Sequence, residues 1–271
     1  MKKLFALLII TTILISIPMV AAVSAKPDVK KAIFIQRIDG FARPDGAGKP
    51  PKPSPEPEEP QLYELMGKNI KWVTPVDLTY VINPKGNLDE SDYSLVSATI
   101  SASAETWDAV VTEELFVAPT TDYVPENGDN YNDAQRDYTN EVFFADLPYD
   151  GAIAVCIVYY INAGPPSQRQ ILEFDLVFDA DLIFVDNLGN THDFSWGNAG
   201  TTDENNLGNT QIMDLQNIAT HELGHALGLA DLYDATSPVP EQTMYGYASA
   251  GETKKRSLEA GDKAGITVLY G

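Results

Sequence analysis

The sequence has almost no cysteine, so its fold cannot depend on disulfides. Cys156 is the single cysteine in 271 residues, and one thiol forms no internal disulfide. Stability must therefore come from side-chain packing and from any bound ions. Cys156 itself lies in the apolar stretch 152–160, which predicts a small buried side chain.

Basic residues are scarce as well. Lys and Arg number 18 against 39 Asp and Glu, which gives a formal net charge of −21. Such a charge repels the phosphates of nucleic acids and anionic membrane surfaces, so neither is expected as a partner. The apolar content of 44% nevertheless predicts a globular protein with a sizeable core rather than a disordered chain.

Long apolar runs are confined to the N-terminus. Residues 4–23 form an almost uninterrupted apolar run after two lysines, and small residues occupy the positions that a signal peptidase reads, up to Ala25. This pattern predicts a cleaved export signal over residues 1–25 and a secreted, extracellular chain. The alternative is an uncleaved membrane anchor, because the run is long enough to span a bilayer. No second run of that length follows, so no further membrane span is expected.

Residues 26–60 differ in composition from the rest of the chain. Pro, Gly, Lys and Glu dominate residues 43–60, and such a stretch builds no core and predicts an extended linker. Before it, residues 26–41 have mixed charge and one short apolar patch at 32–35. We therefore expect a Pro-rich N-terminal segment over 26–60, which is either a propeptide or a spacer, and one folded domain over 61–271.

Hydrophobic periodicity within residues 61–271 predicts both helices and strands. Helices are expected at 92–116, where Trp107 would be a core anchor, and at 214–229. Strands are expected at 78–82, 140–147, 152–161, 171–178 and 181–185. A loop rich in Gly, Asn, Thr and Asp is expected at 187–209.

Histidine is rare too, yet two of the three histidines lie one helical turn apart. His221 and His225 are four residues apart in the second predicted helix, so both imidazoles project from one face and can reach one ion. Zinc is the expected metal, because it prefers tetrahedral coordination, binds imidazole nitrogen well and can keep one coordination position open for water. Glu222, at the edge of the same face, is the expected catalytic base, since its carboxylate can hydrogen-bond that water.

A catalytic zinc site needs a third protein ligand, and Asp231 is the preferred candidate. Gly228 can take the left-handed conformation that ends a helix, which turns the chain back toward the ion. Asp231 follows three residues later, where a carboxylate oxygen can bind zinc. Asp234, another three residues along, is the competitor for this role.

Residues 221–231, His-Glu-Leu-Gly-His-Ala-Leu-Gly-Leu-Ala-Asp, resemble the extended zinc-binding motif of the metzincin metallopeptidases. The whole stretch 72–271 resembles a matrixin catalytic domain. Residues 243–247, Thr-Met-Tyr-Gly-Tyr, are similar to the methionine turn beneath the metal, which would make Met244 its supporting residue. Residues 258–271 resemble the closing helix of matrixin domains.

This resemblance implies an α+β fold: a metzincin-like zincin domain with a twisted, mixed, five-stranded sheet, two long helices and a C-terminal helix. It implies a secreted zinc metalloendopeptidase that hydrolyses peptide bonds by metal-activated water, with protein or peptide substrates such as those of the extracellular matrix. The alternative is a non-catalytic or narrowly specific cell-surface protein that retains the fold. Glu222 argues against a purely binding role, because a binding module needs no base beside its ligands.

The sequence departs from the matrixin pattern in three places. Asp231 replaces the usual third histidine, as in snapalysin-like peptidases. Gly246 replaces the usual proline after the Met-Tyr pair, so the wall of the specificity pocket is not carried over. The cysteine-switch sequence of matrixin propeptides is absent, since Cys156 lies inside the domain.

Several weaker signals stay open. His192 could bind a second, structural zinc, although a hydrogen-bonding role is the default for a lone histidine. Residues 129–137 and 198–209 hold Asp, Asn and Gly that could supply oxygens to a structural Ca²⁺, or could be solvated turns. Tyr245 and Tyr247 could donate a hydrogen bond to the tetrahedral intermediate, or could pack around the methionine turn.

Overall fold

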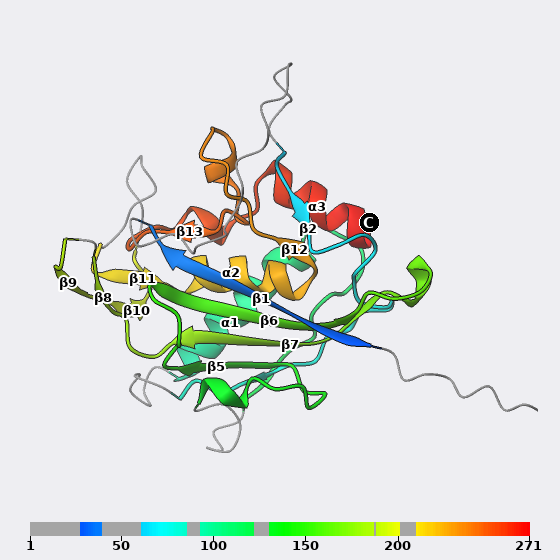
Figure 1. The fold of residues 1–271 in the computed structure, drawn as a ribbon, viewed down its shortest axis with the longest axis horizontal. Helices are drawn as coiled ribbons and strands as arrows, with labels where there is room; N and C mark the ends of the chain where they lie inside the picture. The colour runs from blue at the N-terminus through cyan, green and yellow to red at the C-terminus, as the bar shows by residue number, and fades with distance from the viewer. Residues whose placement is uncertain (1–27, 40–60, 86–92, 122–129, 187, 201–209) are drawn as a thin grey trace, which may run out of the picture.

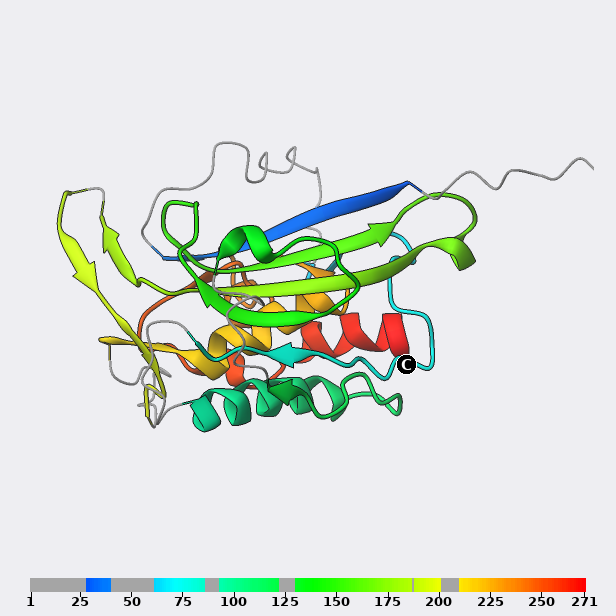
Figure 2. The same ribbon diagram turned by 90° about the horizontal axis from the view of Figure 1, so that it is seen from below.

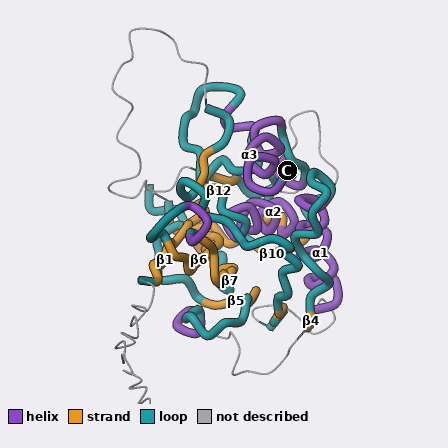
Figure 3. The backbone as a smooth tube through the Cα atoms, turned by 90° about the vertical axis from the view of Figure 1, so that its right-hand side faces the viewer, coloured by secondary structure: helices purple, strands orange, loops and turns teal. Residues whose placement is uncertain are grey.

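The computed structural model describes residues 28–39, 61–85, 93–121, 130–186, 188–200 and 210–271. These residues form two layers, a mixed β-sheet on one side and helices packed against it on the other (Figure 1, Figure 2). Figure 3 shows the same separation along the perpendicular view. The predicted α+β class with a mixed sheet is therefore confirmed.

The main sheet has seven strands among the described residues, where five are predicted. In spatial order they are β13 (Tyr247–Ala248), β1 (Val29–Ile38), β6 (Ala152–Ile161), β7 (Gln170–Asp179), β5 (Glu141–Ala145), β3 (Val81–Ile82) and β4 (Thr120–Thr121). The pairs β1–β6 and β6–β7 are antiparallel, and the other pairs are parallel. Both β6 and β7 are buried on their two faces, and for β6 this burial explains why the strand is a continuous apolar run.

The described part of the chain also contains three two-stranded sheets and three α-helices. The small sheets pair β2 (Glu64–Leu65) with β12 (Leu229–Ala230), β8 (Ile183–Val185) with β9 (Thr191–Asp193), and β10 (Ser195–Gly197) with β11 (Ile212–Asp214). The helices are α1 (Tyr93–Asp108), α2 (Leu215–Ala226) and α3 (Ala260–Tyr270). Two strands, β9 and β10, fall where a loop is predicted over 187–209, of which residues 187 and 201–209 lie outside the described part.

The N-terminal strand is the largest difference from the sequence prediction. The linker expected over residues 26–60 does not hold for Val29–Ile38, which forms β1 inside the main sheet. The exposed side chains of Lys30 and Lys31 interrupt the apolar pattern, so the sequence alone shows only a short patch. Pairing along the whole length of β6 supplies the strand, which is a tertiary effect that local propensity does not report.

The first helix is shorter than predicted, ending at Asp108 rather than at residue 116. The carboxylate of Asp108 accepts hydrogen bonds from the backbone N–H groups of Leu115 (2.6 Å) and Phe116 (3.3 Å). These bonds fold residues 109–116 back on the helix end. Asparagine and aspartate side chains compete with helix hydrogen bonds in this way, and apolar spacing does not reveal it.

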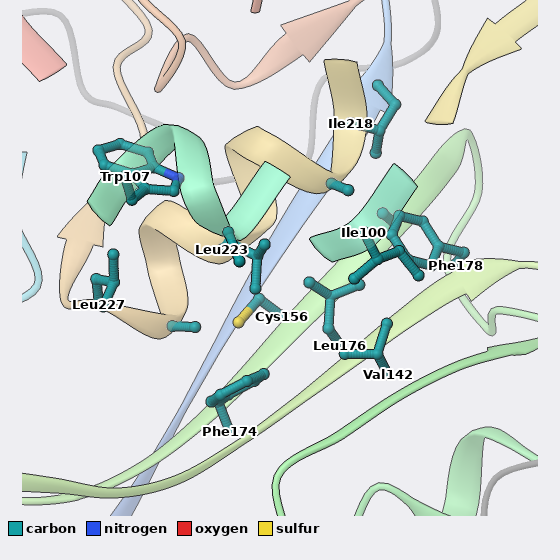
Figure 4. Packing of buried hydrophobic residues seen from close by; sticks show 14 of the residues in the cluster. Ile100, Trp107, Val142, Cys156, Phe174, Leu176, Phe178, Ile218, Leu223 and Leu227 are labelled. Atoms are coloured by element: carbon teal, nitrogen blue, oxygen red, sulfur yellow. The ribbon is translucent and has the colours of Figure 1, made fainter. Parts of the chain in front are cut away.

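The prediction that Trp107 anchors the core is confirmed. Its ring is fully buried, and its indole N–H donates to the carbonyl of Thr220 on α2 at 2.8 Å. Figure 4 shows Trp107 beside α2 and the apolar side chains between the helices and the sheet. Cys156 is among them, buried and unbonded to another sulfur, as predicted. The hydrogen bond from Trp107 to Thr220 therefore joins α1 to α2, the helix that carries the two histidines.

No helix in the described part has both the length and the apolar character needed to cross a membrane. The export signal predicted over residues 1–25 lies outside the described residues, and so does most of the Pro-rich stretch. Both stay predictions.

A buried carboxyl group on β7 leads us to predict that the stability of the fold depends on pH. Asp175 is fully buried, neither of its oxygens has a hydrogen-bond partner, and burial, reinforced by the charges of Glu173 and Glu141, raises its pKa to about 9. Folding therefore takes up a proton between the unfolded pKa near 4 and the folded pKa, so stability falls as pH rises through this window. We expect the stability of Asp175→Asn relative to the parent to rise by about 1.4 kcal/mol for each pH unit between these two pKa values.

Urea unfolding at several pH values measures this relative stability. Asp193→Asn, which changes an exposed carboxylate on β9, is the matched control and should show no such rise. An Asp175→Asn advantage that is independent of pH would show that Asp175 is ionised in the folded protein.

Candidate metal centre

Helix α2 places His221 and His225 on one face, one turn apart, as predicted. The helix starts at Leu215 because the carboxylate of Asp214 caps it, accepting from the backbone N–H of Asn217 at 2.9 Å. Both imidazoles are fully buried, and their Nε2 atoms lie 3.1 Å apart. Two nitrogen donors therefore face one point in space.

Each imidazole is held by a backbone carbonyl on its far side. The Nδ1 atom of His221 lies 2.7 Å from the carbonyl oxygen of Thr243, and that of His225 lies 2.9 Å from the carbonyl oxygen of Leu229. A carbonyl only accepts, so Nδ1 carries the proton in both rings and Nε2 keeps its lone pair. This arrangement is the usual support of metal-binding histidines.

Asp231 joins the two histidines, whereas Asp234 does not. The Oδ1 atom of Asp231 lies 3.2 Å from Nε2 of His221 and 3.3 Å from Nε2 of His225. The chain reaches this position through Gly228, whose φ is +103° and whose added Cβ would lie 2.9 Å from the carbonyl oxygen of Ile70. Asp234 is exposed and accepts from the backbone N–H of Thr236 at 2.8 Å.

These three donor atoms fit a tetrahedral zinc ion. Bonds of roughly 2.0–2.1 Å to zinc place tetrahedral ligands roughly 3.3 Å from one another, and the three separations here are 3.1, 3.2 and 3.3 Å. Among the described residues, His221, His225 and Asp231 are the one group of three or more potential His, Cys, Asp or Glu ligands that meets this closely. The set could therefore hold one metal ion with an open fourth position.

Burial and the mutual charges of the group shift its pKa values in different directions. Burial lowers the pKa of His221 to about 4, against the opposing effect of Asp231. For His225 burial also acts downward, but the charge and hydrogen bond of Asp231, the charge of Glu222 and the bond to the Leu229 carbonyl together outweigh it, and the pKa rises. Burial acts to raise the pKa of Asp231, and the two histidines hold it well below its usual range instead. Asp231 is thus ionised and ready to bind a cation.

Glu222 lies beside this group without joining it. Its side chain is fully buried, neither carboxylate oxygen has a hydrogen-bond partner, and burial raises its pKa to about 8 despite the charge of His225. A carboxyl whose pKa is near neutral can both take up and release a proton at working pH. The position and the acidity therefore suit a general base.

Met244 packs beneath helix α2, where the methionine turn is expected. Met244 is fully buried, and its backbone N–H donates to Asp262 of α3 at 3.1 Å, next to a bond from Thr243 to the same carboxylate at 2.8 Å. A Cβ added to Gly224 would come within 2.3 Å of the Met244 sulfur and 2.7 Å of the Trp107 ring. Glycine between the two histidines therefore lets the methionine approach the helix.

Three residues near the site have roles that the sequence did not suggest. Tyr233 donates from its hydroxyl to Oδ2 of Asp231 at 2.9 Å, which orients the carboxylate. Gly246 gives this ring its space, because a Cβ there would lie 2.4 Å from the Tyr233 ring and 3.0 Å from Oδ1 of Asp231. The fully buried ammonium of Lys255 donates to the carbonyls of Tyr245 and Tyr247, both at 2.6 Å, and fixes the turn.

Gly246 is thus matched to Asp231. In the sequence, Gly246 in place of proline and Asp231 in place of histidine are two independent departures from the matrixin pattern. In the structure they are one feature, since the Tyr233 ring needs the room above Gly246 in order to reach the carboxylate of Asp231.

His192 and the two calcium candidates are not part of this group among the described residues. His192 is on the β8–β9 hairpin, where its Nε2 lies 3.0 Å from Asp186 and its ring stacks on Phe194. Residues 130–137 and 198–200 contribute no carboxylate cluster of the kind that binds a cation, and the remaining residues of the two calcium candidates, 129 and 201–209, lie outside the described part. Tyr247 packs its ring against Tyr233 and Tyr245.

Two comparisons with known proteins bear on this site. The profile of the matrixin family (Peptidase_M10) matches residues 71–271, which include the metal group and the methionine turn. "Metalloendoproteinase 2-MMP" of Arabidopsis thaliana is 28% identical over 208 residues, which cover 72% of this chain and 41% of that protein. The chain therefore spans about two fifths of the length of this curated relative.

Proposed function

This chain belongs to the matrixin family, and on that premise we propose that it is a secreted, zinc-dependent endopeptidase that hydrolyses peptide bonds in unfolded or extended proteins. The observation that carries the proposal is the convergence of two imidazole nitrogens and one carboxylate oxygen within 3.3 Å of one another, with the unpartnered carboxylate of Glu222 beside them. The relative's name, a metalloendoproteinase, agrees with this function.

The roles of the residues follow from their chemistry. His221, His225 and Asp231 would hold zinc, which supplies Lewis acidity to the scissile carbonyl. Glu222 takes the proton from the attacking water as the C–O bond forms, and then delivers it to the leaving amine nitrogen as the C–N bond breaks. Tyr233 keeps the Asp231 carboxylate turned toward the histidines. Met244 and Lys255 fix the turn on which the His221 carbonyl partner lies.

Zinc content and proteolysis measured together test this function. We expect residues 26–271, purified without added metal, to hold about one zinc ion per chain, because the described residues contain one group of three such ligands. Cleavage of a reduced, carboxymethylated protein should be lost on treatment with 1,10-phenanthroline and restored by added zinc. A zinc-loaded chain that cleaves nothing would favour the alternative of a non-catalytic binding protein.

A further inference from the structure

The two carboxylate oxygens of Asp231 have different surroundings. Oδ1 faces the metal group, 3.2 Å from Nε2 of His221 and 3.3 Å from Nε2 of His225, and within the described part of the chain no hydrogen bond reaches it. Oδ2 instead accepts a hydrogen bond from the hydroxyl of Tyr233 at 2.9 Å. One oxygen therefore keeps its lone pairs for a cation, and the other is occupied by a phenol.

The backbone places Tyr233 on the same side as Asp231. Between them, Leu232 forms a bridge with the methionine turn: its N–H donates to the carbonyl of Met244 at 2.8 Å, and its carbonyl accepts from the N–H of Gly246 at 3.0 Å. In such a bridge, as in a strand, alternate side chains project to the same side. The carboxylate and the phenol therefore leave the chain next to each other.

The methionine turn also holds the ring of Tyr233 in its place. The ring lies directly over Gly246, where an added Cβ would come within 2.4 Å of it. Its neighbour on the turn is the ring of Tyr247, with centroids 5.5 Å apart and an angle of 69° between the planes. Lys255 donates to the carbonyls on both sides of Gly246. The position of the hydroxyl is thus set by the turn and not by Asp231 alone.

This arrangement answers a problem that an aspartate brings to a catalytic zinc site. Such a site has three protein ligands and a water in the fourth position. A neutral imidazole offers one lone pair, whereas a carboxylate offers two oxygens. If both oxygens of Asp231 bound, they and the two histidines would supply four protein atoms and fill a tetrahedral shell. A third ligand of this type therefore needs a group that occupies its second oxygen.

From these contacts we propose that Tyr233 is a positioning residue that limits Asp231 to one ligand atom and so keeps a coordination position free for the attacking water. Its hydrogen bond to the carboxylate is charge-assisted, which makes it one of the stronger kind, and it must break before Oδ2 can turn to the metal. The inference rests on the proposed function, because an open position matters only to a catalytic metal. The phenol itself transfers no proton in the reaction.

The test is Tyr233→Phe in the chain 26–271, which removes the hydroxyl and keeps the ring over Gly246. We expect the zinc affinity, measured by competition with a chelator, to equal or exceed that of the parent, because the freed Oδ2 can join the metal. With Co²⁺ in place of zinc, the visible absorption should weaken, as it does when Co²⁺ gains ligands beyond four. The kcat for an unfolded protein should fall about 10–100-fold, with KM unchanged.

The matched control is Tyr247→Phe, which removes a hydroxyl from the ring that packs on Tyr233 and should leave the zinc affinity and the Co²⁺ spectrum as in the parent. If Tyr233 only strengthens the ligand, its variant should lose zinc affinity about 10–100-fold with the Co²⁺ spectrum unchanged. That result, or no change in either measurement, would overturn the inference.

The two metal measurements also separate this inference from the proposed function, because neither needs catalysis. A weaker Co²⁺ spectrum in Tyr233→Phe, with zinc affinity kept, would support the role of Tyr233 even if the parent cleaved no protein, and the peptidase alone would then be wrong. A parent that cleaves protein, with identical Co²⁺ spectra for parent and variant, would leave the peptidase intact and remove the role of Tyr233.

Discussion

Glu222→Gln is expected to lower the rate of peptide-bond hydrolysis about 10²–10⁴-fold while the zinc content stays the same. Glutamine keeps the shape of the side chain but cannot take a proton from water at neutral pH. The metal should be retained because Glu222 lies outside the group formed by His221, His225 and Asp231. Steady-state cleavage of an unfolded protein, together with zinc analysis of the same sample, checks both parts.

The matched control is Glu241→Gln, which changes an exposed carboxylate in the same region of the fold. Its ion pair with Lys254, at 3.8 Å, is exposed and worth little, so neither zinc content nor activity should change. Loss of zinc from the Glu222 variant would mean that this carboxylate is a ligand rather than a base. Full activity with zinc retained would rule it out as the base.

The local part of the site could be predicted from sequence because it is a matter of helical geometry. His221 and His225, four residues apart, lie on the same face of any α-helix. Glycine is the residue type suited to the backbone at position 228, where φ is +103°. The same reasoning predicted β6 to its exact bounds, since a run buried on both faces needs no partner to be recognised. Short-range periodicity and backbone conformation were sufficient there.

The rest of the site depends on contacts between residues that are far apart in the chain or whose approach is not periodic. Lys255 is one of three successive basic residues in the sequence, and such residues usually face solvent. Only the fold shows that its ammonium is buried and donates hydrogen bonds to two backbone carbonyls. Asp262 reads as a helix-start residue, and the structure adds its bonds to Thr243 and Met244. Strand β1 depends on β6, more than 100 residues later. Apolar spacing carries no signal for any of these contacts.

Asp231→Asn is expected to weaken zinc binding by more than the 10–100-fold that loss of an outer partner of a metal site typically costs. The amide retains the size of the side chain but removes the charge that the two imidazoles face at 3.2 and 3.3 Å. At a free zinc concentration 100 times the Kd of the parent, binding adds about 2.7 kcal/mol to stability. For a domain of this size that is a rise in Tm of about 5–10 °C, which should be lost in the variant.

Asp234→Asn is the control that decides between the two candidate ligands, because it makes the same chemical change three residues along. Asp234 is exposed and holds only the turn at Thr236, so its variant should keep the zinc affinity and the zinc-dependent rise in Tm. Thermal melts of parent and variants, with zinc and with EDTA, give the comparison without any need for catalysis. A zinc-dependent rise that survives in Asp231→Asn and disappears in Asp234→Asn would require the loop after Gly228 to rearrange on metal binding. If each variant keeps the full rise in Tm, the two histidines hold the ion without a carboxylate as third ligand.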